Sequence, residues 1–259
     1  MTAVRTQAIA RGPGSRAWAM MILAEGRAIT RDYAGLLLPL VLPLFVLVSS
    51  ASMASSEPIG DTGFTAFEVY VLPIVLTMVL AYVGLLNMPS YLSSYRKTGV
   101  LRRLGVTPAS PLMVLVAQIV VSALLSLVGI ALALVAAFVF FDAIAPAGAL
   151  AVVGACLLVM ACMYGIGMIV ASLAPTTNSA IAVGILLFLG LGALGGMFGG
   201  RDLLPDVLAD LSGYLPFGAG SDLIAATWTG QPVEVSMVVP LIVAVIVSAG
   251  ISLAFFRWE

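Results

Sequence analysis

The chain has 259 residues, of which 62% are hydrophobic and only 9% are charged. A soluble domain is about half apolar and about a quarter charged, and no fold of this size can bury so much apolar surface, so most of the chain must face lipid. The absence of histidine excludes Ser-His-Asp and Cys-His catalytic centres and histidine-ligated zinc or haem, and a net charge of −1 gives no basic surface for nucleic acid.

Residues 1–15 are expected to be a flexible N-terminus, and residues 16–33 an elbow helix lying on the cytoplasmic face of the membrane. The apolar run at 17–24 is too short to span a bilayer and is followed at once by charged residues, which is unlike a signal peptide. An interfacial helix of this kind inserts apolar anchors and presents basic residues to lipid phosphates. The expected membrane contacts are Trp18, Ile22, Arg27 and Arg31.

Six apolar stretches are long enough to cross the hydrocarbon core, which needs about 20 residues. Residues 143–200 carry no formal charge and would form a helix of roughly 87 Å, about three bilayer cores, so this stretch must fold back. The polar, proline-containing cluster at 174–179 is the expected break. The predicted fold is therefore an all-α integral membrane domain covering residues 1–259. Its spans are expected at 36–53, 69–90, 111–141, 148–174, 179–199 and 236–256.

The distribution of charge predicts the orientation of the spans. Ten of the 11 basic residues lie before the first span, between the second and third, or after the sixth, and with an even number of spans these regions share one side. The opposite side carries Arg201 alone together with nine acidic residues. Because Lys and Arg concentrate in cytoplasmic loops, we expect both termini in the cytoplasm.

The connection at 93–108 is longer than two neighbouring helices require. Val100, Leu101 and Leu104 share one face of a helix, basic residues lie elsewhere on it, and Thr107-Pro108 ends it before the third span. One interpretation is a simple positive-inside retention signal. The other is a short helix that docks into another protein on the cytoplasmic side.

The outer connection at 201–234 contains apolar residues at helical spacing, interrupted by prolines and glycines. It is expected to form short helices that dip partly into the outer leaflet, in a broken re-entrant segment before the sixth span. An alternative is a small extracellular lid without a role in transport. Just before it, Gly192/Gly196 and Gly195/Gly199 form small-xxx-small patterns that permit close helix approach.

The sequence contains no energy source of its own. No Asp, Glu, Lys or Arg lies in the middle of a span, where ion-coupled transporters usually place one. No phosphate-binding loop of the Gly-x-x-x-x-Gly-Lys-Ser/Thr type is present. If the protein moves a compound uphill, a partner must supply the energy.

These features resemble the membrane subunit of a type-2 ATP-binding-cassette exporter, the permease family that includes bacterial drug-resistance exporters. Residues 25–32, followed by Pro39 and Pro43, resemble the elbow and first span, and residues 69–73 resemble the entry to the second span. The most specific match is 99–108, which resembles the coupling helix that contacts the ATPase. The family often has acidic residues before this helix, where this chain has basic ones at 96 and 97. The matching outer residues are Pro205, Leu215, Pro216, Phe217 and Asp222.

The resemblance implies a permease that moves a hydrophobic or amphipathic compound (a drug, natural product or lipid) across a bacterial inner membrane. It implies two copies of a separate ATPase subunit, which bind ATP and Mg²⁺, and a second permease subunit, identical or different. This chain is expected to have no catalytic residue, metal site or bound cofactor and to contact lipid and a small hydrophobic substrate. The residues implied in ATPase coupling are Tyr95, Arg96, Lys97, Gly99, Leu101, Arg102, Arg103 and Leu104.

Two other functions remain open at this stage. A channel or scaffold without ATP coupling would share the six spans but would have no ATPase partner. An integral-membrane lipid enzyme would need carboxylate clusters, histidine or a metal at the interface, and the inner side offers none of these.

Overall fold

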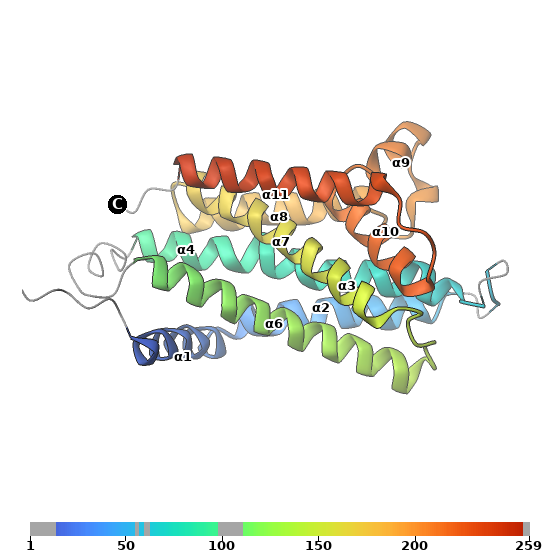
Figure 1. Cartoon of the computed structure of the whole chain (residues 1–259), viewed down its shortest axis with the longest axis horizontal. Helices are drawn as coiled ribbons and strands as arrows, with labels where there is room; N and C mark the ends of the chain where they lie inside the picture. Colours follow the sequence, from blue (N-terminus) through green and yellow to red (C-terminus); the bar gives the residue numbers. More distant parts are fainter. Residues whose placement is uncertain (1–13, 55–56, 60–62, 98–110, 256–259) are drawn as a thin grey trace, which may run out of the picture.

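The computed structural model describes residues 14–54, 57–59, 63–97 and 111–255. Within these residues six helices are long and apolar enough to cross a membrane, and they run along one bundle (Figure 1). The predicted all-α membrane fold is confirmed. The spanning helices are α2 (Tyr33–Ala51), the continuous helix Phe67–Lys97, α6 (Pro111–Phe140), α7 (Ala149–Leu173), α8 (Thr177–Leu194) and α11 (Val235–Phe255).

The helix Phe67–Lys97 forms the centre of the bundle. It consists of two π-helical turns, η2 (Phe67–Val71) and η3 (Val83–Asn87), that alternate with α3 (Leu72–Tyr82) and α4 (Met88–Lys97). Along its most apolar 18 residues 72% are buried, whereas the corresponding share in the other five spans is 17–33%. The outer helices instead expose large apolar side chains, such as Phe45 on α2 and Leu253 on α11, as a lipid-facing surface requires.

The predicted break between the fourth and fifth spans is confirmed. α7 ends at Leu173 and α8 begins at Thr177, after Pro175. Thr176 caps α8 in a reciprocal capping box, in which its hydroxyl accepts a hydrogen bond from the Ser179 amide (3.1 Å). The proline and the cap together explain why the uncharged stretch folds back here.

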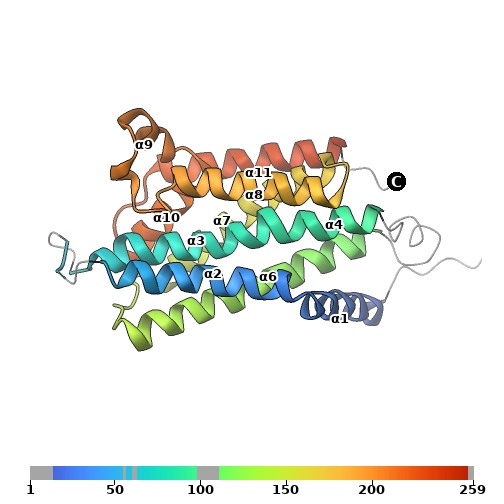
Figure 2. The ribbon, with the colours of Figure 1, turned by 180° about the vertical axis from the view of Figure 1, so that it is seen from behind.

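Both ends of the described chain lie at the same end of the bundle. α1 (Ser15–Arg31), the last turn of α4 and the end of α11 lie at the left in Figure 1, and Figure 2 shows α1 leading into α2 near the end of α4. The short helices α9 (Asp206–Ser212) and α10 (Pro216–Thr229) lie at the opposite end. This is the arrangement that an even number of spans requires.

Three glycines allow the central helix to approach its neighbours closely. A Cβ on Gly167 of α7 would overlap the carbonyl oxygen of Gly84, and one on Gly184 of α8 would overlap the carbonyl oxygen of Leu85. A Cβ on Gly84 itself would lie 2.8 Å from the carbonyl carbon of Met163. Because each opposing atom belongs to the backbone, only glycine fits at these positions.

The Gly192/Gly196 and Gly195/Gly199 patterns do not form one continuous helix face, although Gly195 does permit a close approach, because a Cβ there would overlap the Phe217 ring of α10. α8 ends at Leu194, short of the predicted boundary at 199, and residues 195–199 form turns. Gly196 and Gly199 have φ angles of +88° and +129°. Gly196 and Gly199 are used because they adopt backbone conformations that L side chains rarely reach.

Candidate functional site

A row of three polar side chains runs along one face at the end of the central helix. Asn87, Tyr91 and Tyr95 are four residues apart, so they lie on the same side of the helix. Asn87 Nδ2 donates to the carbonyl oxygen of Gly35 (2.6 Å), and the Tyr91 hydroxyl donates to Asp32 Oδ2 (2.8 Å). The Tyr95 hydroxyl donates to Glu25 Oε2 (2.6 Å). We call these three residues the polar row.

The acceptors of the polar row lie on α1 and at the corner between α1 and α2. Asp32 ends α1 and caps α2, accepting a hydrogen bond from the Gly35 amide (3.1 Å). A Cβ on Gly35 would overlap the Tyr91 hydroxyl, so glycine is needed for this approach. Glu25 is 7% exposed, and burial raises its pKa, while the hydrogen bond from Tyr95 opposes that rise.

Arg96 connects the same turn of α4 to a third helix. Its Nη1 donates to the carbonyl oxygen of Ser172 (3.1 Å), and its Nη2 donates to that of Ala174. These carbonyls belong to the end of α7, where unpaired backbone oxygens and the helix dipole favour a cation. Lys97 is exposed at the end of α4.

The coupling residues predicted from the sequence are thus only partly described by the structure. Tyr95, Arg96 and Lys97 belong to the final turn of a helix continuous with the second span, so the predicted end of that span near residue 90 and the predicted start of the connection at residue 93 are wrong. The helix continues because Tyr91 and Tyr95 find partners at the α1–α2 corner and on α1. The remaining predicted coupling residues lie outside the described part: Gly99, Leu101, Arg102, Arg103 and Leu104.

The predicted elbow forms an amphipathic helix, α1, that packs against α6. Trp18 and Ile22, predicted as lipid anchors, are half-buried and share a face with the buried Glu25 and Ile29. Ile22 packs against the hydrophobic core of the bundle. The opposite face is exposed; it carries Arg16, Met20, Leu23, Arg27 and Arg31.

At the other end of the bundle, the predicted broken segment consists of η4 (Arg201–Leu203), α9 and α10. Pro205 precedes α9 and is exposed, whereas Leu215 and Pro216 begin α10 and are half-buried. α10 turns back into the bundle, so Phe217 is fully buried. Arg201 Nη1 forms an ion pair with Asp222 Oδ2 (2.8 Å), and its Nη2 donates to the carbonyl oxygen of Gly218 (2.9 Å).

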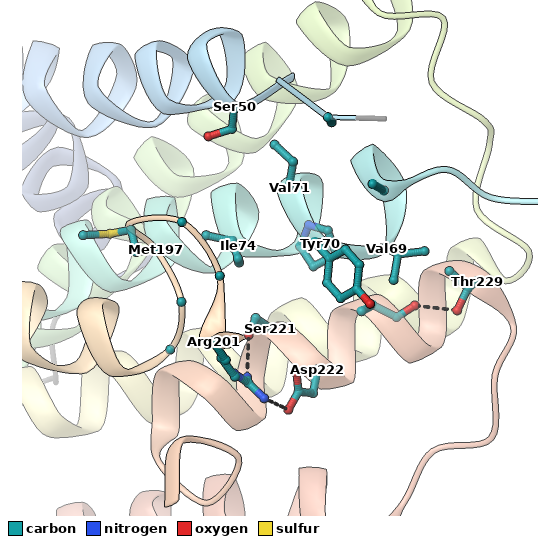
Figure 3. Close-up of a pocket in the computed structure, with 18 of the residues that line it drawn as sticks. Ser50, Val69, Tyr70, Val71, Ile74, Met197, Arg201, Ser221, Asp222 and Thr229 are labelled. Carbon is teal, nitrogen blue, oxygen red and sulfur yellow. Dashed lines mark hydrogen bonds and ion pairs between the residues drawn. The ribbon is translucent and has the colours of Figure 1, made fainter. Parts of the chain in front are cut away.

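A cavity of about 720 Å³ lies beside this ion pair. Figure 3 shows Arg201, Ser221 and Asp222 on one side and Tyr70, Val71 and Ile74 of the central helix on the other. Further walls come from the end of α2 and from the glycine turn at 195–200. The cavity therefore combines mainly apolar walls with one paired cation and anion, a surface suited to an amphipathic molecule.

A second polar contact at this end was not anticipated from the sequence. Glu68 of η2 is 2% exposed; its Oε1 accepts from the Ile144 amide (3.0 Å), and its Oε2 accepts from the Thr65 amide (2.9 Å). The Trp228 indole of α10 donates to the carbonyl oxygen of Ile144 (3.1 Å). The only sign of this contact in the sequence is an acidic residue, Glu68, at the start of an apolar span. Its partners are 76 and 3 residues away, and the long-range one depends on the fold.

Comparison with known families decides the identity. The family model described as "ABC-2 type transporter" matches residues 16–227, which is most of the chain. The chain belongs to the ABC-2 type transporter family. It is therefore a multi-pass ABC transporter permease subunit, and membership implies an ATPase subunit as partner. A search of curated proteins found no match. Among the described residues, no three His, Cys, Asp or Glu side chains are grouped as metal ligands.

Proposed function

We propose that this ABC-2 permease subunit belongs to an ATP-driven exporter that moves a hydrophobic or amphipathic compound out of the cytoplasm or the inner leaflet. The observation that carries the proposal is the family match over residues 16–227. Since the sequence contains no phosphate-binding loop, ATP and Mg²⁺ bind to the partner ATPase. The compound is a drug, a natural product or a lipid, and the physiological outcome includes efflux of antibiotics.

The proposed orientation follows from the basic residues. The end of the bundle with α1, Arg96 and Lys97 faces the cytoplasm, where Lys and Arg concentrate. Two permease subunits, identical or different, and two ATPase subunits then assemble in a bacterial cell membrane. Residues 99–104 contact the ATPase, as the family resemblance implies.

The chemistry of the outer cavity supports an amphipathic substrate. Its walls carry apolar side chains such as Val71, Ile74 and Met197, next to the Arg201–Asp222 ion pair. A volume of about 720 Å³ is within the range of sites for drug-sized molecules, about 300–1,000 Å³. We assign this cavity to the exit side of the transport path.

Reconstitution of the purified complex tests the proposal. The permease and its co-purified ATPase are placed in proteoliposomes, and ATP-dependent movement of a lipophilic fluorescent dye and of a fluorescent phospholipid is measured. Movement of either probe that requires ATP and Mg²⁺ supports the proposal. Movement without ATP identifies a channel, and chemical conversion of the phospholipid identifies a lipid enzyme. A stable complex with no ATPase identifies a scaffold. Each of these last three outcomes contradicts the proposal.

The proposed ATPase contact has its own test. Arg102→Glu and Leu104→Glu are expected to abolish ATP-dependent transport while the protein still inserts into the membrane. Arg16→Glu on the exposed face of α1 is the matched control and should transport normally. Normal transport by the first two variants, with the ATPase bound, contradicts the assignment of this segment.

A further inference from the structure

The last two turns of α4 are held on two sides by directional hydrogen bonds. On one side, Tyr91 donates to Asp32 at the α1–α2 corner, and Tyr95 donates to Glu25 on α1. On the other, Arg96 donates to carbonyls at the end of α7. With Asn87, these contacts extend over about 13 Å of helix at 1.5 Å per residue. The end of α4 therefore moves together with α1, α2 and α7, or these bonds break.

Stability alone does not explain the Tyr95–Glu25 contact, because the contact requires a buried carboxylate. Glu25 is 7% exposed on α1, and within the described residues it forms no ion pair. Burying a carboxylate is unfavourable unless hydrogen bonds compensate, and an apolar residue packed there would serve stability as well. A directional bond from a stiff tyrosine instead fixes the position of α1 relative to α4.

The helices tied to α4 also reach the outer cavity. α2 lines that cavity directly through Val46, Ser50 and Met53. α7 packs against α10, and Val159 of α7 lies next to Gly220, two residues before Asp222. A displacement of the α4 end is thus connected through two separate helices to two walls of the cavity.

We propose that Tyr95, with Glu25 and Arg96, forms a mechanical joint that transmits movement of the end of α4 to the α1–α2 corner and to α7, and so couples the ATPase to the outer cavity. Tyr95 is a positioning residue in this proposal, because it acts through α1 and does not contact the transported compound. The inference rests on the proposed function for its link to ATP, but the joint itself rests on the hydrogen bonds of the described residues.

The first test measures coupling in the reconstituted permease–ATPase complex. Tyr95→Phe and Glu25→Leu should each lower the number of dye molecules moved per ATP at least fivefold, and the double variant should be no worse than either single one. Glu25→Gln keeps an acceptor for Tyr95 and should retain coupling. Tyr33→Phe, at an exposed tyrosine near the same corner, is the matched control. Normal coupling in Tyr95→Phe, or additive losses in the double variant, overturns the joint.

The second test does not depend on transport. Spin labels are placed at Arg16→Cys on α1 and Leu173→Cys at the end of α7, both exposed, with Cys156 and Cys162 replaced by alanine. The measured α1–α7 distance distribution should be narrow in this background and should broaden when Tyr95→Phe and Arg96→Gln are added. An unchanged distribution overturns the joint. If the two substitutions broaden the distribution but the wild-type complex shows no ATP-dependent transport, the proposed function alone is contradicted.

Discussion

Glu25 couples the stability of the corner between α1 and α2 to pH. Its pKa is raised above the ordinary value of 4.5 by burial, against the opposing hydrogen bond from Tyr95. An acid with a raised pKa binds its proton more tightly in the folded protein, so its contribution favours the folded state at low pH and is lost as the pH rises above 4.5 through the raised value.

We therefore expect Glu25→Gln, which stays uncharged, to become progressively more stable relative to wild type as the pH is raised from mildly acidic to neutral. SDS-induced unfolding of the purified protein at a series of pH values measures this difference. Asp210→Asn on the exposed surface of α9 is the control and should give a constant difference. A constant difference for Glu25→Gln as well contradicts the prediction.

Glu68 holds the loop between α6 and α7 through its Oε1, which accepts from the Ile144 amide, while its Oε2 accepts from the Thr65 amide just before η2. In Glu68→Gln one oxygen becomes an NH₂ group that faces a backbone N–H donor. The variant should lose about 1–3 kcal/mol of unfolding free energy, the penalty of unsatisfied buried polar groups. Glu234→Gln, at an exposed position, should change it little. Equal stability of the two variants in SDS-induced unfolding is the outcome that rules out this role.

The helix elements of the bundle meet through backbone contacts at glycine. Gly167→Ala should destabilise the protein by about 1–3 kcal/mol, because the added methyl group would overlap the Gly84 carbonyl and one of the two backbones would have to shift. Gly154→Ala, on the same helix α7 but with open space around it, is the matched control and should be neutral or slightly stabilising. Similar unfolding free energies for both variants would show that α7 is not packed as described.

The π-helical turn η3 adds a second feature at this scale. It begins at Val83, includes Gly84 and ends at Asn87, the first residue of the polar row. A π-turn shifts the helix face that follows it, and such turns often occur at functional sites. Residues of α3 at the same four-residue spacing therefore do not lie on the helix face that carries Asn87, Tyr91 and Tyr95.

At the scale of the whole molecule, the proposed orientation predicts which surfaces are accessible from outside. In a variant lacking Cys156 and Cys162, a membrane-impermeant maleimide should label Asp210→Cys on α9 in intact cells. It should label Arg16→Cys on α1 only after the cells are permeabilised. Both positions are exposed, so accessibility in the folded protein is matched. The reverse labelling pattern would contradict the proposed orientation. It would also contradict the assignment of the cavity to the exit side of the transport path.

Composition and charge pattern were sufficient to predict a six-span, all-α membrane protein, because lipid requires long apolar helices and the polar cluster at 174–179 interrupts the longest apolar stretch. The boundaries that failed did so for tertiary reasons. The second span continues to Lys97 because Tyr91 and Tyr95 bind the α1–α2 corner, and the fifth ends at Leu194 because glycines form a turn.

The candidate site depended more heavily on the fold. Patterns along the chain indicated where Tyr95, Arg96 and Asp222 belong, at the two ends of the bundle. They could not identify Glu25, Ala174 and Arg201 as the partners, since these are 70, 78 and 21 residues away in sequence. Local sequence determines which segments enter lipid through their hydrophobicity, whereas directional hydrogen bonds between distant segments form only after the helices have packed, and only the tertiary structure decides them.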